Sequence, residues 1–188
     1  MNRKTLIRAT SILAVLAPGS WAAGLVVLAG LFAAYAPDAH ATAPSGVTST
    51  LLAKGTFADN IDALTLTNTA VDPNGQTNVW RAWINTKGAS DLEVLQNTFA
   101  PGGTFGWHSH PGPSLVIVKS GTATFYMGDD PTCTPHVVPA GSGFVDSGHD
   151  VHVVRNEGRE ELVVVVASLI PAGATRRIDE PSPGNCAF

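Results

Sequence analysis

Three histidines are the residues of this chain best suited to bind a metal ion. His108 and His110 lie two residues apart after a glycine-rich segment, and His152 lies in the apolar run 151–154. Residues two apart in a strand point to the same side, so the first two imidazoles should project together with Ser109 turned away. Three neutral imidazoles that converge form a site for a divalent Fe, Mn, Zn, Cu or Ni ion. We therefore predict one metal site at these histidines, in preference to surface or structural hydrogen-bonding roles.

The segments that must position these histidines are predicted to be short β-strands. After residue 46 there is no helical periodicity, and runs of β-branched and aromatic residues alternate with turn residues. The predicted strands are 47–57, 78–85, 92–99, 114–119, 122–127, 143–146, 151–155 and 162–169. The predicted loops are 42–46, 68–77 and 128–135. Closely spaced strands without helices indicate an all-β sandwich or barrel.

Four segments carry finer predictions. Residues 101–103 should form a turn, and Ser120-Gly121 should close a hairpin between the strands that flank it. The run 162–166 is apolar throughout, which is typical of a strand covered on both faces. The tail 171–188 is rich in Pro and Gly and should wrap the surface.

The spacing of glycines and histidines resembles the cupin superfamily. Its first motif is Gly, five residues, His-x-His, three or four residues, Glu, six residues and Gly. This chain has Gly102, five residues, the 108–110 His-Ser-His, three residues, Ser114, six residues and Gly121. The spacing is kept, but Ser114 stands where the family has Glu.

The second cupin motif also has a counterpart here. In the family it is Gly, five residues, Pro-x-Gly, two residues, His, three residues and Asn. This chain has Gly141, five residues, Ser-Gly-His at 147–149, two residues, His152, three residues and Asn156. Together the two motifs span the core 102–156.

The resemblance implies an all-β fold, the cupin double-stranded β-helix, which is a jelly-roll-like barrel. It implies a single domain over 42–188 and metal ligands at His108, His110 and His152. It also implies a homodimer, because cupins commonly pair through outer strands. The sequence offers Trp80, Trp83 and Trp107 as possible interface aromatics. By strand alternation Trp107 should point away from the metal, so core packing or an interface is expected for it.

The loss of the family's Glu leaves the three predicted ligands neutral. A replacement carboxylate or further ligand could come from Asp150, His149 or Asp146, which we rank in that order. Asp150 is preferred because it lies two residues before His152 and would face the same side of a regular strand. Each of these residues could instead orient an imidazole through its other nitrogen. Ser114 itself is expected to be an ordinary strand-starting residue, with a role as a further ligand or in orienting a ligand as the alternative.

Residues 1–41 differ in kind from the rest of the chain. Arg3, Lys4 and Arg8 precede a stretch without charge, and 39–41 is a small-x-small sequence of the type that export peptidases cleave. The apolar segment 21–36 has 16 residues, whereas a membrane-spanning helix needs roughly 20. We predict a cleaved signal peptide, with an uncleaved membrane anchor as the alternative. Either one exports the domain.

The charge limits which kinds of partner are expected, and the cysteines indicate the compartment in which the domain works. The whole chain has 11 basic and 15 acidic residues, and without the leader the balance is 8 against 14, a net charge of −6. This surplus argues against nucleic-acid binding and against adhesion to anionic lipid. A small-molecule ligand or substrate is therefore expected, with membrane contact only if the leader remains. Cys133 and Cys186 should form a disulfide in an oxidising compartment.

Several functions fit these residues. The chain has no Gly-x-Gly-x-x-Gly turn, so in an enzyme the metal would carry the chemistry. Oxidation of a small organic molecule in the manner of a dioxygenase is the preferred reaction. The alternatives are a non-catalytic binding or sensing module, and a metal-assisted isomerase or hydrolase. Uptake of dioxygen would distinguish oxidation from the others.

Overall fold

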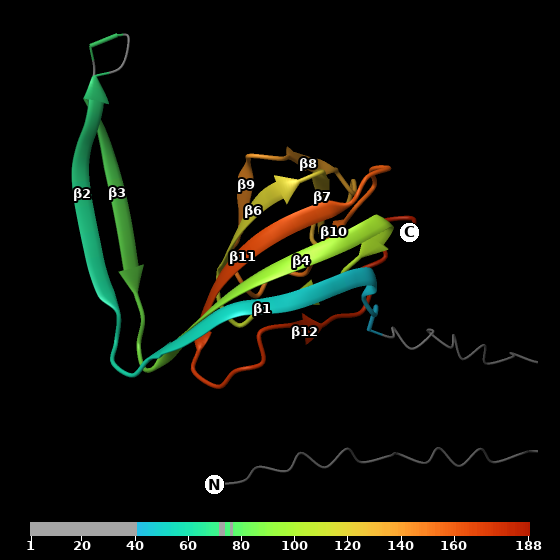
Figure 1. Cartoon of the computed structure of the whole chain (residues 1–188), viewed down its shortest axis with the longest axis horizontal. Helices are drawn as coiled ribbons and strands as arrows, with labels where there is room; N and C mark the ends of the chain where they lie inside the picture. Colours follow the sequence, from blue (N-terminus) through green and yellow to red (C-terminus); the bar gives the residue numbers. More distant parts are fainter. Residues whose placement is uncertain (1–40, 72–73, 76) are drawn as a thin grey trace, which may run out of the picture. The chain divides into compact units, whose positions relative to one another are not determined.

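The structure is a computed structural model that describes residues 41–71, 74–75 and 77–188 (Figure 1). The predicted leader therefore lies outside the described residues, apart from Ala41. Within these ranges the regular structure consists of twelve β-strands, as expected for an all-β chain. This part of the chain contains no helix of the length and apolar character needed to cross a membrane.

One wall of the domain is an antiparallel sheet of long strands. Its members, in spatial order, are β1 (Ser45–Phe57), β4 (Ser90–Thr104), β11 (Leu162–Pro171), β6 (Ser114–Ser120) and β9 (Gly143–Asp146). β4 and β11 are central and are paired along ten residues, from Leu162 opposite Phe99 to Pro171 opposite Ser90. This wall carries most of the apolar core.

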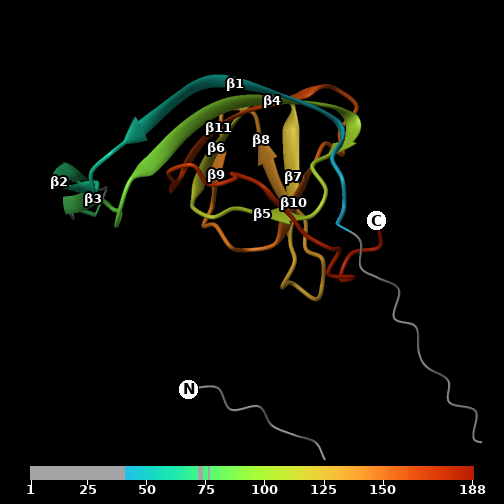
Figure 2. The same cartoon turned by 90° about the horizontal axis from the view of Figure 1, so that it is seen from below.

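The second wall is built from shorter strands and holds the predicted metal ligands. Its members, in spatial order, are β12 (Ile178–Asp179), β5 (His108–Ser109), β10 (His152–Arg155), β7 (Thr122–Met127) and β8 (His136–Pro139). Arg155 of β10 also pairs with Thr104 of β4, so the two walls join into one nearly closed sheet (Figure 2). The predicted β-barrel is confirmed.

The turn at Ser120-Gly121 does not close a hairpin, which corrects the prediction. β6 pairs with β9 and β11, whereas β7 pairs with β8 and β10. Gly121 has a φ of 74°, and a Cβ on it would lie 2.6 Å from the carbonyl oxygen of Glu161. Only glycine allows this positive φ and this close approach without strain. The chain crosses from one wall to the other here, and local turn residues are the same for a crossing as for a hairpin.

The predicted turn at 101–103 is also corrected, because these residues lie inside β4. Ser45 pairs with Thr104 and Val47 pairs with Phe99, so the register against β1 shifts between these two pairs. Gly102 takes a φ of 77° and its N–H donates to the carbonyl of Asn156. The Pro-Gly-Gly segment is therefore a bulge that bends one strand and keeps it in the sheet.

A strand occupies part of the segment predicted to be the loop 68–77. β2 (Asp62–Val71) pairs antiparallel with β3 (Thr77–Asn85). The prediction was wrong because the polar residues at the end of β2 lack the apolar alternation on which strand prediction depends. The short strands β5, β8 and β12 have too few residues for that pattern to appear.

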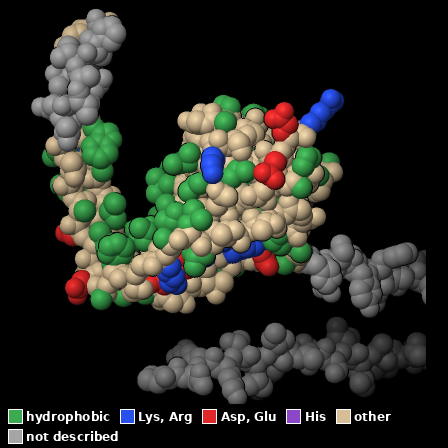
Figure 3. All heavy atoms as spheres, in the orientation of Figure 1, with side chains coloured by type: hydrophobic (Ala, Val, Ile, Leu, Met, Phe, Trp, Pro, Cys, Tyr) green, Lys and Arg blue, Asp and Glu red, His purple; other side chains and the backbone are tan. Residues whose placement is uncertain are grey.

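Large hydrophobic side chains are exposed on the β2–β3 hairpin and on the outer face of β6 and β9 (Figure 3). They are Leu64, Leu66, Trp80, Trp83, Ile84, Leu115, Ile117 and Val145. Trp107, by contrast, is 2% exposed, which removes it from the possible interface aromatics. Trp80 and Trp83 remain available, and the homodimer stays a prediction.

The core lies between the two walls and is formed by inward-facing aliphatic and aromatic residues. Phe99, Val118 and Leu162 are completely buried. Along β11 buried residues alternate with half-buried ones. This corrects the expectation that 162–166 is covered on both faces: one face is in the core, and the other is only partly covered.

The C-terminal tail wraps back over the short-stranded wall, as expected. A disulfide joins Cys133 to Cys186, which confirms the predicted pairing. Cys186 packs with Trp107, Tyr126 and Val153 in a second buried cluster. β12 pairs with β5, and the backbone N–H of Glu180 donates to the carbonyl of Trp107. The tail is thereby held against the strand that carries His108.

Candidate metal site

The three predicted histidines converge at one point inside the barrel. Their ligand nitrogens lie within 4.8 Å of one another, and the residues are 3%, 5% and 4% exposed for His108, His110 and His152. His108 and His152 are direct cross-strand partners on β5 and β10. His110 is the residue directly after β5. The pairing of two short strands therefore brings together residues that are more than forty positions apart.

Each imidazole is oriented by a hydrogen bond from its Nδ1 atom to a backbone carbonyl. The acceptors for His108, His110 and His152 are the carbonyls of Gly106, Arg176 and Asp150, at 2.8, 2.7 and 2.9 Å. A carbonyl oxygen can only accept, so all three Nδ1 atoms must carry the proton. In the neutral ring Nε2 then has a free lone pair, which is the form that ligates metals.

Burial keeps the rings of His108 and His110 neutral. The pKa of His108 is lowered to about 2, first by burial and then by the nearby His152 and Arg177. Burial also lowers the pKa of His110, against the opposing effects of the Arg176 carbonyl and Asp146. A buried imidazolium would lose its hydration, which is the cause of both shifts.

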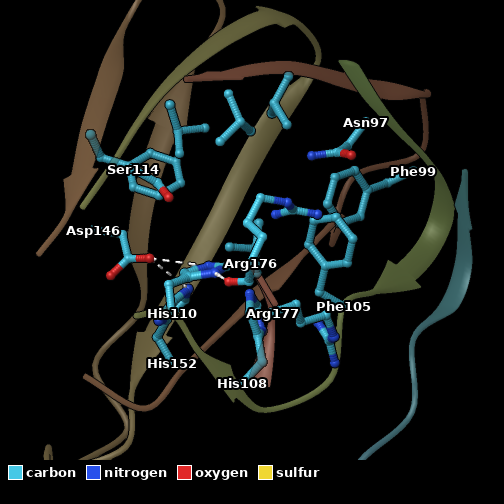
Figure 4. Close-up of a pocket in the computed structure, with 15 residues that line it drawn as sticks. Asn97, Phe99, Phe105, His108, His110, Ser114, Asp146, His152, Arg176 and Arg177 are labelled. Carbon is cyan, nitrogen blue, oxygen red and sulfur yellow. Dashed lines mark hydrogen bonds and ion pairs between the residues drawn. The ribbon is translucent and has the colours of Figure 1, made fainter. Parts of the chain in front are cut away.

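Asp146 faces the imidazoles from β9. Its Oδ2 lies 3.1 Å from Nε2 of His110 and 3.6 Å from Nε2 of His152 (Figure 4). Its Oδ1 accepts the backbone N–H of Gly148 at 3.0 Å, whereas Oδ2 is buried without a hydrogen-bond donor. Because His110 is neutral, two electron-pair acceptors face each other at this short distance. A cation between them would satisfy both, so the residues present fit a metal ion.

The turn after Asp146 explains the departures from the second cupin motif. Gly148 has a φ of 82°, and a Cβ on it would lie 2.8 Å from the carbonyl carbon of Gly112. His149 stands at the motif's second Gly and also has a positive φ, 61°. Its backbone N–H donates to the carbonyl of His110 at 2.8 Å. This backbone packs the turn tightly against the site and directs the Asp146 carboxylate inward.

Of the possible additional ligands, the structure places Asp146, which we ranked last, beside the imidazoles. The side chains of His149 and Asp150 are exposed, and neither belongs to the cluster of ligand nitrogens. Asp150 does orient His152, but through its backbone carbonyl. The prediction assumed a regular strand through Asp150, whereas β10 begins only at His152.

Ser114 is buried at the position of the family's Glu. Its Oγ forms a 2.8 Å hydrogen bond with Oγ of Ser168 on β11. It is the cross-strand partner of Asp146. The hydroxyl is thus occupied by a side chain of the neighbouring strand β11.

A cavity of about 30 Å³ lies beside the histidines. Its lining includes apolar side chains and three polar residues that the sequence analysis did not select, Asn97, Arg176 and Arg177 (Figure 4). Two sequence signals could have indicated them. Arg176 and Arg177 are the only basic residues of the tail 171–188, and Asn97 interrupts the apolar alternation of β4. Nothing in the local sequence shows that both signals concern one cavity.

A family model for the cupin domain matches residues 96–168. Among solved structures, a double-stranded β-helix protein from Klebsiella pneumoniae is similar at 20% identity and a TM-score of 0.40, over 65% of this chain and 85% of that one. A cupin superfamily protein from Desulfitobacterium hafniense is similar at 18% identity and a TM-score of 0.38, over 42% and 67%.

An oxalate oxidase in complex with glycolate is similar at 29% identity and a TM-score of 0.36, over 41% of this chain and 41% of that one. The match thus spans less than half of the oxalate oxidase chain. The search of curated proteins found no match. The matched residues 96–168 include all three convergent histidines and Asp146, and this chain therefore contains a cupin domain.

Proposed function

We propose that this protein is an exported metalloprotein that binds one divalent ion at His108, His110, His152 and Asp146. The observation that carries the proposal is the convergence of three imidazoles, two of which have Nε2 within 3.6 Å of an unpaired buried carboxylate oxygen. Nitrogen and oxygen donors of this kind suit Fe, Mn, Zn, Cu or Ni. Asp146 would supply the negative charge that the family's Glu supplies elsewhere.

Export is supported by the disulfide and by the predicted leader. Disulfides persist in oxidising compartments and are rare in the cytosol. The Cys133–Cys186 bond is therefore typical of a secreted or cell-envelope protein.

We propose metal-dependent oxidation of a small organic molecule by dioxygen as the reaction. The ion, when bound, would supply Lewis-acid and redox chemistry at the site. Phe99, Phe105 and Phe144 line the cavity and exclude bulk water from it.

A non-catalytic binding module is the second candidate. The observation that favours it is the cavity volume of about 30 Å³, which leaves room for little more than one or two water molecules. A small ligand could fill this space without a second reactant. Isomerisation or hydrolysis assisted by the metal would proceed without dioxygen.

Elemental analysis of the purified protein tests the metal site. We expect about one divalent ion per chain in the wild type and a loss of nearly all of it in the His108→Ala, His110→Ala double variant. The matched control is the His136→Ala, His149→Asn double variant, which changes two exposed histidines. Asn is chosen at 149 because it tolerates the positive φ there. Equal metal content in both double variants would contradict the site.

Oxygen uptake then separates the candidate functions. Uptake that depends on the metal and on an added small organic molecule supports oxidation. Product formation without uptake indicates isomerisation or hydrolysis, and ligand binding without turnover indicates the binding module.

A further inference from the structure

Unpaired polar atoms gather around the cavity beside the histidines. In the described part of the chain, six buried side-chain nitrogen and oxygen atoms have no hydrogen-bond partner. Five of them belong to Asn97, Asp146 and Arg177, which all line this cavity. A buried polar atom without a partner is costly, so such atoms are expected to meet a ligand or water. The proposed metal ion would pair with the unpaired oxygen of Asp146. It does not account for the unpaired atoms of Asn97 and Arg177.

Arg177 presents an unoccupied guanidinium edge. Its Nε donates to Oδ1 of Asp179 at 2.6 Å, whereas Nη1 and Nη2 are buried without an acceptor. The guanidinium carbon lies 5.7 Å from the ring centroid of Phe105, another residue of the cavity lining. Two parallel N–H donors in one plane match the two oxygens of a carboxylate.

The charges around the cavity favour an anion at this edge. Asp179 contacts only the Nε side of Arg177, and its own side chain is half exposed. The neighbouring Arg176 lies with its Nε 3.6 Å from Glu93 Oε2 and also lines the cavity. Asp146 is directed at the imidazoles. Nη1 and Nη2 of Arg177 are therefore buried positive donors beside the cavity that have no acidic partner.

Asn97 is a second residue of the cavity lining that has unpaired polar atoms. It is 1% exposed, and both its Oδ1 and its Nδ2 lack partners. An amide with a free donor and a free acceptor can bind a hydroxyl, a carbonyl or a second carboxylate. It comes from β4, on the wall opposite the tail that carries Arg177.

We infer that the cavity binds the carboxylate of a small organic acid, which accepts hydrogen bonds from Nη1 and Nη2 of Arg177. This inference rests on the proposed function and assigns the substrate or ligand class of the same site. The cavity of about 30 Å³ restricts the acid to a few non-hydrogen atoms. The apolar lining excludes water and thereby strengthens the charged hydrogen bonds.

Calorimetric titration of the full chain with formate and with acetate tests the inference. Each acid is titrated into metal-free protein and into protein loaded with Zn²⁺, and acetamide serves as the neutral counterpart of acetate. Arg177→Gln removes both the charge and the pair of parallel N–H donors. Arg177→Lys keeps the charge but not the paired donors. Arg159→Gln is the control, because Arg159 is exposed. Zinc content and melting temperature are measured for every variant.

We expect the wild type and Arg159→Gln to bind at least one of the acids and to reject acetamide. Arg177→Gln should weaken binding by about tenfold or more, with Arg177→Lys in between, because a hydrogen bond to a charged group is lost. Zinc content should be unchanged in all of them. If Arg177→Gln does not fold, Arg177→Lys and the preference for acetate over acetamide carry the test.

Equal affinity of wild type and Arg177→Gln, or no binding of either acid to the wild type, would overturn the inference. Both results are distinct from failure of the proposed function, which appears as zinc content that does not depend on His108 and His110. Acid binding that depends on Arg177 in the metal-free protein supports the inference in either case.

Discussion

Ser114 and Asp146 are directly paired across β6 and β9. Ser114 occupies the position at which cupins carry the Glu ligand, and the residue opposite it supplies a carboxylate whose Oδ2 lies 3.1 Å from Nε2 of His110. The acidic group of the site is thus on the neighbouring strand. Cross-strand partners have adjacent Cβ atoms, so either strand can deliver a carboxylate to the same cavity.

Asp146→Asn tests whether the carboxylate on β9 takes the role that the Glu at position 114 has in other cupins. The variant keeps the shape and the acceptor for the Gly148 N–H but removes the negative charge, so metal affinity should fall by about 10- to 100-fold. Competition with a fluorescent zinc chelator measures the affinity. Asp150→Asn is the control, because Asp150 is exposed and orients His152 only through its backbone. An equal loss in both variants would show that Asp146 has no special role.

The tautomers of the histidines can be read directly by NMR. Long-range ¹H–¹⁵N spectra of metal-free protein at neutral pH should show protonated Nδ1 and unprotonated Nε2 for His108 and His110, because their Nδ1 atoms donate to carbonyls and burial keeps the rings neutral. A protonated Nε2 on His108 at neutral pH would contradict the proposed ligand atom.

Asp91 should make the fold sensitive to acid. The Gly173 N–H, followed by Lys54 and Thr56, holds the pKa of Asp91 below its ordinary value of 3.8. A carboxyl group whose pKa is lower in the folded state stabilises the fold above the unfolded pKa, and this contribution is lost as the pH falls below it. The free energy of unfolding should therefore decrease between about pH 5 and pH 2, and Asp91→Asn should reduce this dependence.

Urea denaturation at several pH values measures the effect of Asp91. The exposed Asp59→Asn variant is the control and should keep the wild-type pH dependence. Because Asp91 accepts from Gly173, three residues before Arg176, Asp91→Asn should also loosen the tail. An unchanged pH profile in Asp91→Asn would reject this account.

Reduction of the disulfide should destabilise the domain. Cys133 and Cys186 are 53 residues apart, and the chain-entropy model gives about 4 kcal/mol for a loop of that size. The Cys133→Ser, Cys186→Ser double variant should lose a comparable free energy of unfolding. The fluorescence of Trp107 should change as well, because Cys186 packs against it. Mass mapping of unreduced peptides from exported protein should find the two cysteines linked, and two free thiols would contradict export.

The sequence by itself predicted the parts of the site that depend on local spacing. His108 and His110 are separated by one residue, and His152 lies in a run of apolar residues that forms a strand. Such patterns are properties of neighbouring residues, so they are visible without coordinates. The disulfide was predictable for a similar reason, since the chain contains only two cysteines.

The tertiary structure decided everything that depends on which strands become neighbours. It placed Asp146 rather than Asp150 beside the imidazoles, because β10 begins at His152 and β9 ends at Asp146. It brought Arg177 from the tail to the cavity that Asn97 lines from β4. It separated β6 from β7 at Gly121, where the sequence favours a hairpin. Strand pairing is a long-range choice made by burial of the whole core, and no local pattern records it.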